Sequence, residues 1–150
     1  MSCSLYVGFR ILSRPQVKQL KFRGKLGTFS GSLINKKAEN WGEWVEDRPR
    51  GSRYVGNFQD DLAHGYGVFY LLGDIKHYEG QWKAGRPHGS GVEFFEDGKK
   101  AHEGEWENGH PHGWGISYYE NGEKAYEGEW QNNAYSGQGT LYRQDGTVYH

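Results

Sequence analysis

Three histidines occupy one position in successive sequence repeats, and histidine is the commonest side-chain ligand for metals. His64, His88 and His112 follow one another at intervals of 24 residues. If each interval is one β-hairpin with strands about 4.8 Å apart, successive imidazoles are about 9–10 Å apart. Bonds to zinc are about 2.0–2.1 Å long, so these histidines cannot share one ion. His110 stands near His112, but no third ligand accompanies them. We therefore expect no metal and no cofactor, and we expect these histidines to face solvent in turns.

Glutamates form a second repeating set, on alternate positions of short segments. The set comprises Glu79, Glu103, Glu105, Glu127 and Glu129. Paired carboxylates catalyse acid–base reactions where a cleft perturbs their pKa values. Carboxylates that recur in every unit are instead typical of a solvent-facing strand face that discourages aggregation of sheets. The alternative role is a negative stripe that binds a basic partner or the chain's own N-terminal segment.

No pattern pairs a nucleophile with a base. The single cysteine, Cys3, lies in a basic N-terminal segment. No intrachain disulfide can therefore form, and a reducing intracellular compartment is expected. Glycine-rich stretches such as residues 85–91 do not begin helices, so they do not predict a phosphate-binding loop. We expect no catalytic residues and no enzymatic activity.

Charge is distributed unevenly along the chain. Residues 1–50 contain ten lysines and arginines and four acids, whereas residues 51–150 contain eight and fifteen. The acidic part would repel a phosphate backbone, so nucleic acid is not an expected partner. Anionic lipid is expected to bind only through residues 10–37, if at all. The first 38 residues hold eight basic residues and no acid. This composition is typical of an organellar transit peptide, and the alternative is a basic strand or arm that docks on the acidic repeats.

The elements that must position these side chains are visible as an internal repeat. Four segments align without a gap, with a glycine or an aromatic residue in each of five columns. The columns are Gly56, Gly80, Gly104 and Gly128; Phe58, Trp82, Trp106 and Trp130; Gly65, Gly89, Gly113 and Gly137; Gly67, Gly91, Gly115 and Gly139; and Tyr70, Phe94, Tyr118 and Tyr142. With 24 glycines and only 35% hydrophobic residues, the chain is expected to form β-structure with many tight turns.

Each segment is interpreted as a β-hairpin. Side chains alternate along its first strand, which places Tyr78, Gly80 and Trp82 on one face and Glu79 and Gln81 on the other. The pair Asp97-Gly98 predicts a tight turn to the next unit. A glycine between two aromatic residues leaves space for a neighbouring ring. Stacked hairpins should therefore form a ladder of tryptophans, with the tyrosine and phenylalanine column beside it.

A resemblance to the MORN repeat (membrane occupation and recognition nexus) rests on the pattern Tyr-Glu-Gly-Glu-Trp-x-Asn-x-x-x-x-Gly-x-Gly at residues 126–139. It covers residues 54–150, as four repeats at 54–77, 78–101, 102–125 and 126–148. The resemblance implies an all-β fold, an elongated and twisted single-layer antiparallel sheet of consecutive hairpins. It also implies use as a scaffold in cytoskeletal, ciliary or membrane-associated assemblies.

A degenerate form of the repeat pattern continues towards the N-terminus. Gly42-Glu-Trp44 has the spacing of Gly80-Gln-Trp82. Tyr54, which begins the next repeat, follows after fewer residues than in the other repeats, so we predict that this unit lacks most of its second strand. We expect residues 22–53 to form degenerate capping repeats and residues 1–21 to form a basic N-terminal arm. At the other end, residues 139–143 are expected to form an open edge that makes an end-to-end contact with a neighbour.

The expected function is a non-catalytic scaffold, a structural subunit of a larger assembly with protein partners. Its aromatic face is expected to form a groove for a helix or an extended segment of a partner. The groove residues are Tyr54, Phe58, Tyr78, Trp82, Trp106, Tyr118, Tyr126 and Trp130. The alternatives are an accessory subunit of an organellar, mitochondrial enzyme complex and a cytoskeletal or membrane tether that uses the basic arm. The expected location is intracellular, in the cytoplasm or the cytoskeleton, which includes the cilium. The alternative location is the mitochondrion.

Overall fold

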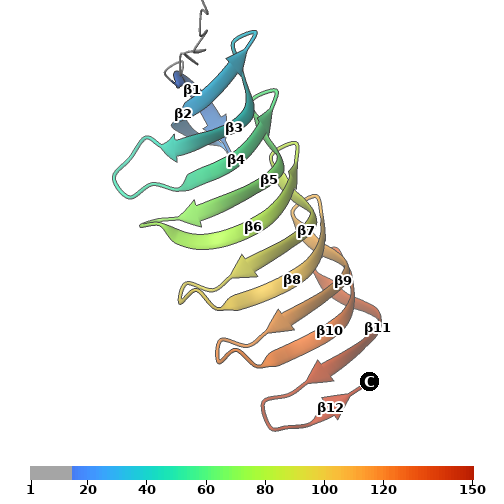
Figure 1. The fold of residues 1–150 in the computed structure, drawn as a ribbon. Coiled ribbons are helices and arrows are strands. Elements are labelled where there is room, and N and C mark those ends of the chain that lie inside the picture. The colour runs from blue at the N-terminus through green and yellow to red at the C-terminus, as the bar shows by residue number, and fades with distance from the viewer. Residues whose placement is uncertain (1–14) are drawn as a thin grey trace, which may run out of the picture.

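One continuous sheet of twelve strands accounts for the part of the protein that this computed structural model describes, residues 15–150. The strands are antiparallel and neighbour one another in sequence order (Figure 1), which confirms the all-β prediction. Their bounds are β1 Gln16–Phe22, β2 Lys25–Ile34, β3 Lys37–Glu46, β4 Arg53–Gln59, β5 Leu62–Leu71, β6 Ile75–Lys83, β7 Arg86–Phe94, β8 Lys100–Glu107, β9 His110–Tyr118, β10 Lys124–Gln131, β11 Ala134–Tyr142 and β12 Val148–Tyr149. Among residues 15–150, no helix is long and apolar enough to cross a membrane.

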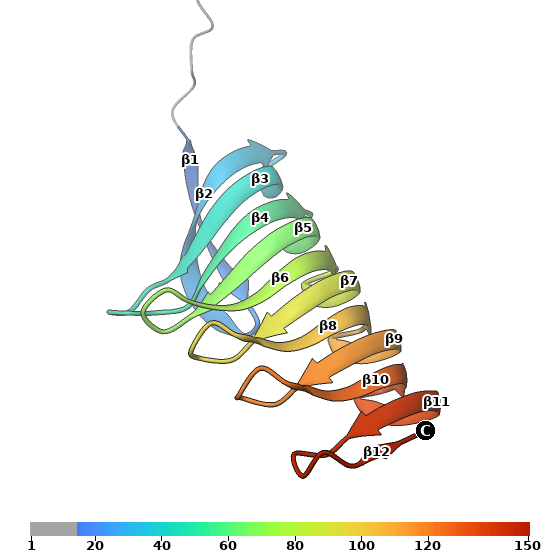
Figure 2. The same cartoon turned by 60° about the horizontal axis from the view of Figure 1, so that its bottom comes forward.

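Four hairpins, β4–β5, β6–β7, β8–β9 and β10–β11, coincide with the first to fourth sequence repeats. Two glycines face each other across each hairpin, as Gly80 and Gly91 do between β6 and β7. A Cβ on Gly80 would clash with the backbone of Gly91, and a Cβ on Gly91 would clash with the ring of Tyr78. Glycine is required at both positions because the tyrosine ring lies across the pair. The strands are strongly curved along their length (Figures 1 and 2).

The turns between repeats form where the sequence predicts them. The N–H of Phe95 donates to the carbonyl of Lys99 at 2.8 Å, and the N–H of Gly98 donates back to the carbonyl of Phe95 at 2.9 Å. Gly98 has a φ of 83°, in the left-handed region that glycine adopts without strain. The same bonds recur after the third and fourth repeats, at Asn121-Gly122 and Asp145-Gly146.

The two faces of the sheet differ sharply in chemistry. We call the face that carries Tyr78 and Trp82 the inner face, and the face that carries Glu79 and Gln81 the outer face. On the inner face, the ring of Tyr78 contacts Trp82 of its own repeat and Trp106 of the next, with centroids 5.2 Å apart in both pairs. Both contacts are edge-to-face, a geometry that stabilises by about 0.5–1.5 kcal/mol per pair beyond area burial. The rings of successive repeats therefore form one continuous row.

Each tryptophan of the row also joins its repeat to the preceding one by a hydrogen bond. Indole N–H groups donate to glycine carbonyls of the preceding repeat, in the pairs Trp82 to Gly67 (3.1 Å), Trp106 to Gly91 (3.2 Å) and Trp130 to Gly115 (3.2 Å). The bond satisfies a donor that is buried with its ring, which would otherwise carry a desolvation cost of about 1–3 kcal/mol. Stability is therefore shared between neighbours along the array.

The N-terminal part of the sheet differs from the predicted boundaries. The sheet begins at Gln16, inside the segment interpreted as an arm, because β1 pairs with β2 along its whole length. Strands β2 and β3 form a complete hairpin in which Gly31 faces Gly42, as paired glycines do in each later repeat. The predicted alignment of Gly42-Glu-Trp44 with a first strand is therefore wrong, since β3 is the second strand of its hairpin. Residues 1–14 of the arm lie outside the described residues.

Strand β1 closes the N-terminal end of the aromatic row. The ring of Phe22 lies 5.0 Å from Tyr54, 5.7 Å from Phe69 and 5.9 Å from Trp82, so it spans the inner face of the first repeat. The indole of Trp44 donates to the carbonyl of Leu20 at 3.1 Å. The hairpin β1–β2 therefore acts as a cap that supplies one apolar ring and one backbone acceptor.

The C-terminal end is covered only in part. Leu141 and Tyr142 of β11 pair with Tyr149 and Val148 of β12. Residues 134–140 of β11 face no further strand within residues 15–150. The unpaired edge is thus shifted towards the start of the strand relative to the predicted residues 139–143, and an end-to-end contact there stays a prediction.

Candidate interaction surfaces

The inner-face rings predicted to line a groove are buried. Only 0–9% of the surface of seven of these residues is exposed: Tyr54, Phe58, Tyr78, Trp82, Trp106, Tyr126 and Trp130. They form the core of the array by packing on one another, and they leave almost no area for a partner. The sequence places Tyr118 in the same set, but in the structure it lies on the outer face, where its hydroxyl donates to Glu103.

His102 takes the place of the inner-face tyrosine in the third repeat. Its ring is 4% exposed and lies between Trp106 (5.2 Å) and Trp130 (4.7 Å). Neither ring nitrogen has a hydrogen-bond partner among the described residues. Burial lowers the pKa of His102 to about 4, against a smaller opposing effect of Glu103, so the imidazole is neutral at pH 7. The alignment of the repeats shows histidine in place of tyrosine at this position. The sequence alone does not show that the histidine is buried, so it did not indicate that this residue is important.

The predicted turn histidines stand apart from one another. His112 lies 3.4 Å from Glu107, an ion pair only when the imidazole is protonated. The prediction that they face solvent in turns is wrong, because His64, His88 and His112 lie on strands β5, β7 and β9 and are half-buried. Within residues 15–150, no group of three or more histidine, cysteine, aspartate or glutamate side chains lies close enough together to hold a metal ion.

The predicted acidic face divides into two kinds of carboxylate. One kind is neutralised: Glu79, Glu103 and Glu127 pair with Lys76, Lys100 and Lys124 at 2.7, 2.5 and 2.6 Å. Outer-face tyrosines add hydrogen bonds, as Tyr66 does to Glu79. Bonds from the lysine and then from Tyr66 lower the pKa of Glu79, and the bond to the carboxylate raises that of Tyr66 to about 12. This ladder is therefore internally compensated and offers little free charge.

The second kind, Glu105 and Glu129, pairs with no lysine or arginine within the described part of the chain. Both side chains are exposed, and both reach the glycine bulge of the neighbouring strand. Glu105 accepts a long hydrogen bond from the backbone N–H of Trp114, at 3.4 Å. Gln81 holds the equivalent position in the second repeat and accepts from the N–H of Ser90 at 3.2 Å. A neutral amide makes this contact in the second repeat, so the contact itself does not need a charge.

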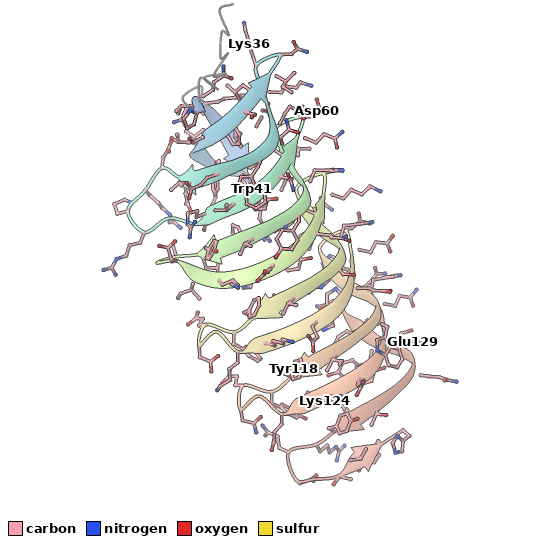
Figure 3. All side chains as sticks on the ribbon, in the orientation of Figure 1. Lys36, Trp41, Asp60, Tyr118, Lys124 and Glu129 are labelled. Carbon is pink, nitrogen blue, oxygen red and sulfur yellow. The ribbon has the colours of Figure 1, made fainter. Side chains whose placement is uncertain are left out.

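Three large aromatic side chains are exposed on this outer face. Trp41, Tyr66 and Trp114 are 54%, 44% and 53% exposed. Each directly precedes the inner-face glycine of a second strand, and each pairs with an outer-face residue of the following strand: Trp41 with Asn57, Tyr66 with Gln81 and Trp114 with Glu129. Figure 3 shows Trp41 and Tyr118 on the same side of the sheet. Sequence reasoning missed these residues because they vary between repeats, although their fixed place before a glycine was a usable signal.

A small cavity lies where the cap meets the first repeat. Its volume is about 220 Å³, and Phe22, Trp44 and Phe69 supply its apolar part. Arg23 and Lys25 stand at its polar part, but Lys25 also reaches Glu46 at 3.3 Å. Sites for small organic ligands usually enclose about 300–1,000 Å³, so this cavity is smaller than a typical ligand pocket.

Comparison with known proteins gives one positive result. The family model described as "MORN repeat" matches residues 54–71, 78–100, 102–124 and 126–148, more than half of the chain. Each match spans one of the four hairpins, from the first strand into the second and on towards the following turn. A search of curated proteins found no match.

Proposed function

The chain belongs to the MORN-repeat family, and from this premise we propose that it is a non-catalytic scaffold that binds a protein partner on its outer face. Repeats of this family are in general protein- or membrane-interaction modules. The proposal assigns this chain to the protein-binding kind and moves the contact surface from the predicted groove to the opposite side of the sheet.

One observation carries the proposal: large aromatic side chains are exposed at equivalent positions of three hairpins. Trp41, Tyr66 and Trp114 lie on β3, β5 and β9, so a surface that touches all of them spans most of the array. Tryptophan and tyrosine are the residues most enriched at the energetic centres of protein interfaces. Their recurrence at one position of the repeat, on one face of the sheet, distinguishes them from apolar residues scattered singly over a surface.

The burial of the inner face supports the same choice. A helix that entered the inner face would meet ring edges that already contact one another, and it would gain little further apolar burial. The outer face has free rings between polar residues, which is the usual composition of a transient interface.

Site-specific photo-cross-linking in the native cell tests the proposal. A benzophenone amino acid is placed at Tyr66 or Trp114 on the outer face, and at the half-buried inner-face positions Glu93 or Ser117 as matched controls. We expect a discrete adduct from the outer positions that is absent from the controls. Adducts from the inner positions alone would return the partner to the predicted groove and refute the outer-face assignment.

The two alternative functions, a lipid or cytoskeletal tether and an accessory subunit of an organellar enzyme complex, depend more on the basic N-terminal region than the outer-face scaffold does. A tether to anionic lipid through residues 10–37 would use lysines of β1 to β3, yet Lys18 and Lys37 already pair with Asp61 and Asp60 at 2.5 and 2.6 Å. That engagement favours a cap over a lipid-binding arm. An accessory role in an organellar enzyme complex remains compatible with an outer-face contact, and the identity of the cross-linked partner distinguishes it from a cytoskeletal or ciliary role.

A further inference from the structure

The array is electrically polarised from one end to the other. Residues 15–53 contain nine lysines and arginines and four acids, whereas residues 102–131 contain seven glutamates and one lysine. The glutamates that lack a cationic partner therefore lie in a region where the long-range field is also negative. A positive partner gains from both the local carboxylates and this field.

The exposed aromatic positions of the first and third repeats have different neighbours. Tyr66 is flanked on the outer face by Asn57 and Gln81, which are neutral, and its hydroxyl donates to Glu79, whose charge Lys76 neutralises. Trp114 is flanked by Glu105 and Glu129, one on each neighbouring strand. The backbone is equivalent at both sites, so the chain itself contains a neutral version and an anionic version of the same surface.

The two glutamates beside Trp114 have no lysine or arginine of this chain, within residues 15–150, to neutralise them. The neutralised glutamates of the outer face have lysines three positions earlier in the chain, whereas Glu105 and Glu129 have none within residues 15–150. The indole of Trp114 is 53% exposed, and its strand β9 lies between the strands of the two glutamates, β8 and β10. Tryptophan is the side chain best suited to hold a cation over its ring face, and carboxylates on both sides supply charge-assisted hydrogen bonds.

From this arrangement we propose that the Trp114 site, composed of Trp114, Glu105 and Glu129, binds a lysine or arginine side chain from a basic segment of the protein partner. The proposal rests on the proposed outer-face function and names the chemistry of its partner. The cation lies over the indole, and its N–H groups donate to the two carboxylates. The neutral Tyr66 site contributes apolar contact to the same interface without a preference for charge.

A protein segment fits this site better than the other polyions. The carboxylates repel the phosphates of nucleic acid and of anionic lipid. A second copy of this chain could present its own basic end, and a zwitterionic lipid could present a choline group, so both are outcomes that the test must separate.

The test measures the affinity of the purified chain for a fluorescein-labelled dodecapeptide of alternating arginine and glycine, by fluorescence anisotropy at low salt. The decisive variant is the double substitution Glu105→Gln and Glu129→Gln. Gln81 already provides the same amide acceptor in the second repeat, so glutamine at position 105 retains the contact with the backbone N–H of Trp114 while the variant removes both charges. We expect it, and Trp114→Ala, to weaken binding by about three- to thirtyfold each. Leu72→Ala, which removes an exposed apolar side chain in a turn outside this surface, is the matched control and should change affinity less than twofold.

Binding should also weaken as salt rises, because the site is exposed and its charges are screened. A peptide with glutamine in place of arginine should bind at least tenfold more weakly than the arginine peptide. Equal binding of the two peptides, or full affinity of the double glutamine variant, would overturn the proposal. So would salt-sensitive self-association of the chain that the double variant abolishes, or binding to phosphatidylcholine vesicles without binding to the peptide.

The outcome separates the two proposals. Cross-links from Trp114 to a partner, together with no preference for the arginine peptide, would retain the outer-face function and reject the basic segment. Arginine binding that requires Trp114 and both glutamates, without outer-face cross-links in cells, would establish the site chemistry and reject the assigned function.

Discussion

Replacing His102 by tyrosine should stabilise the protein and remove part of its sensitivity to acid. In the other repeats the inner-face phenols donate to a backbone carbonyl three residues ahead, at 3.0 Å for Tyr54, 3.1 Å for Tyr78 and 3.0 Å for Tyr126. The equivalent carbonyl in the third repeat is that of Glu105. A tyrosine at position 102 has a glycine beneath it, at Gly115, as the other three have.

The magnitude follows from two effects. At neutral pH the new hydrogen bond and the removal of two unpaired ring nitrogens should add about 1–2 kcal/mol to the free energy of unfolding. The second effect depends on pH, because the folded protein holds the pKa of His102 at about 4 whereas an unfolded histidine titrates near 6.5. A lowered pKa means that the unfolded state binds the proton more tightly, so stability is lost as pH falls below 6.5. The loss is about 1 kcal/mol at pH 5.5 and about 2–3 kcal/mol at pH 4.5.

Urea unfolding followed by tryptophan fluorescence at pH 7.5, 6.5, 5.5 and 4.5 measures both effects. We expect the advantage of His102→Tyr to grow from about 1–2 kcal/mol at pH 7.5 to about 3–5 kcal/mol at pH 4.5. The converse substitution Tyr78→His should import the acid sensitivity into the second repeat. A constant difference between His102→Tyr and the native protein across these pH values would refute the buried neutral imidazole.

Three further substitutions test the packing of the array. Trp82→Phe removes the N–H that donates to the preceding repeat at 3.1 Å and should cost about 1–2 kcal/mol in urea unfolding. Gly91→Ala introduces a methyl group where the ring of Tyr78 lies and should cost about 2–3 kcal/mol, measured as a lower thermal midpoint. Phe22→Ala removes the ring that covers the first repeat, should cost about 3 kcal/mol, and should make the β1–β2 hairpin the first site of limited proteolysis.

Exposed neighbours provide the controls for these three changes. Trp41→Phe alters an indole that is 54% exposed, and Ser90→Ala and Lys21→Ala alter exposed residues next to the tested positions. Each should change stability by less than about 0.5 kcal/mol. If a control destabilises as much as its buried counterpart, the contacts described for the inner face are not the cause of the loss.

The fold was predictable from the sequence where its determinants are local. The columns of glycine and tryptophan identify the four hairpins, and Asp97-Gly98 and its equivalents identify their turns, because both depend on residues close in the chain. The hairpin β2–β3 was harder to recognise, since it keeps the facing pair Gly31 and Gly42 but has no tryptophan at the position of Trp82. The strand β1 was not predictable, because its place depends on the contact of Phe22 with rings far along the chain.

The interaction surface was harder to predict than the fold. Side-chain alternation from Gly115 puts Tyr118 on the outer face, and a stricter count along β9 would have shown it. The burial of the inner-face rings depends on contacts between repeats, which no single repeat reveals. Lys76 neutralises the charge of Glu79, whereas no lysine neutralises Glu105 within residues 15–150. This difference likewise depends on side-chain positions and not on the residue types alone.

The indole hydrogen bonds all point towards the N-terminus, and this has a consequence for the order in which the hairpins fold during synthesis. Each tryptophan reaches back to a carbonyl that precedes it in the chain, so during synthesis every donor emerges after its acceptor. A growing chain therefore adds each hairpin to a surface that is already complete, starting from the cap. Shortening the array from its C-terminal side removes donors and leaves carbonyls that water can reach. Shortening it from the N-terminal side leaves an indole N–H facing its lost partner, so the two truncations should differ in cost.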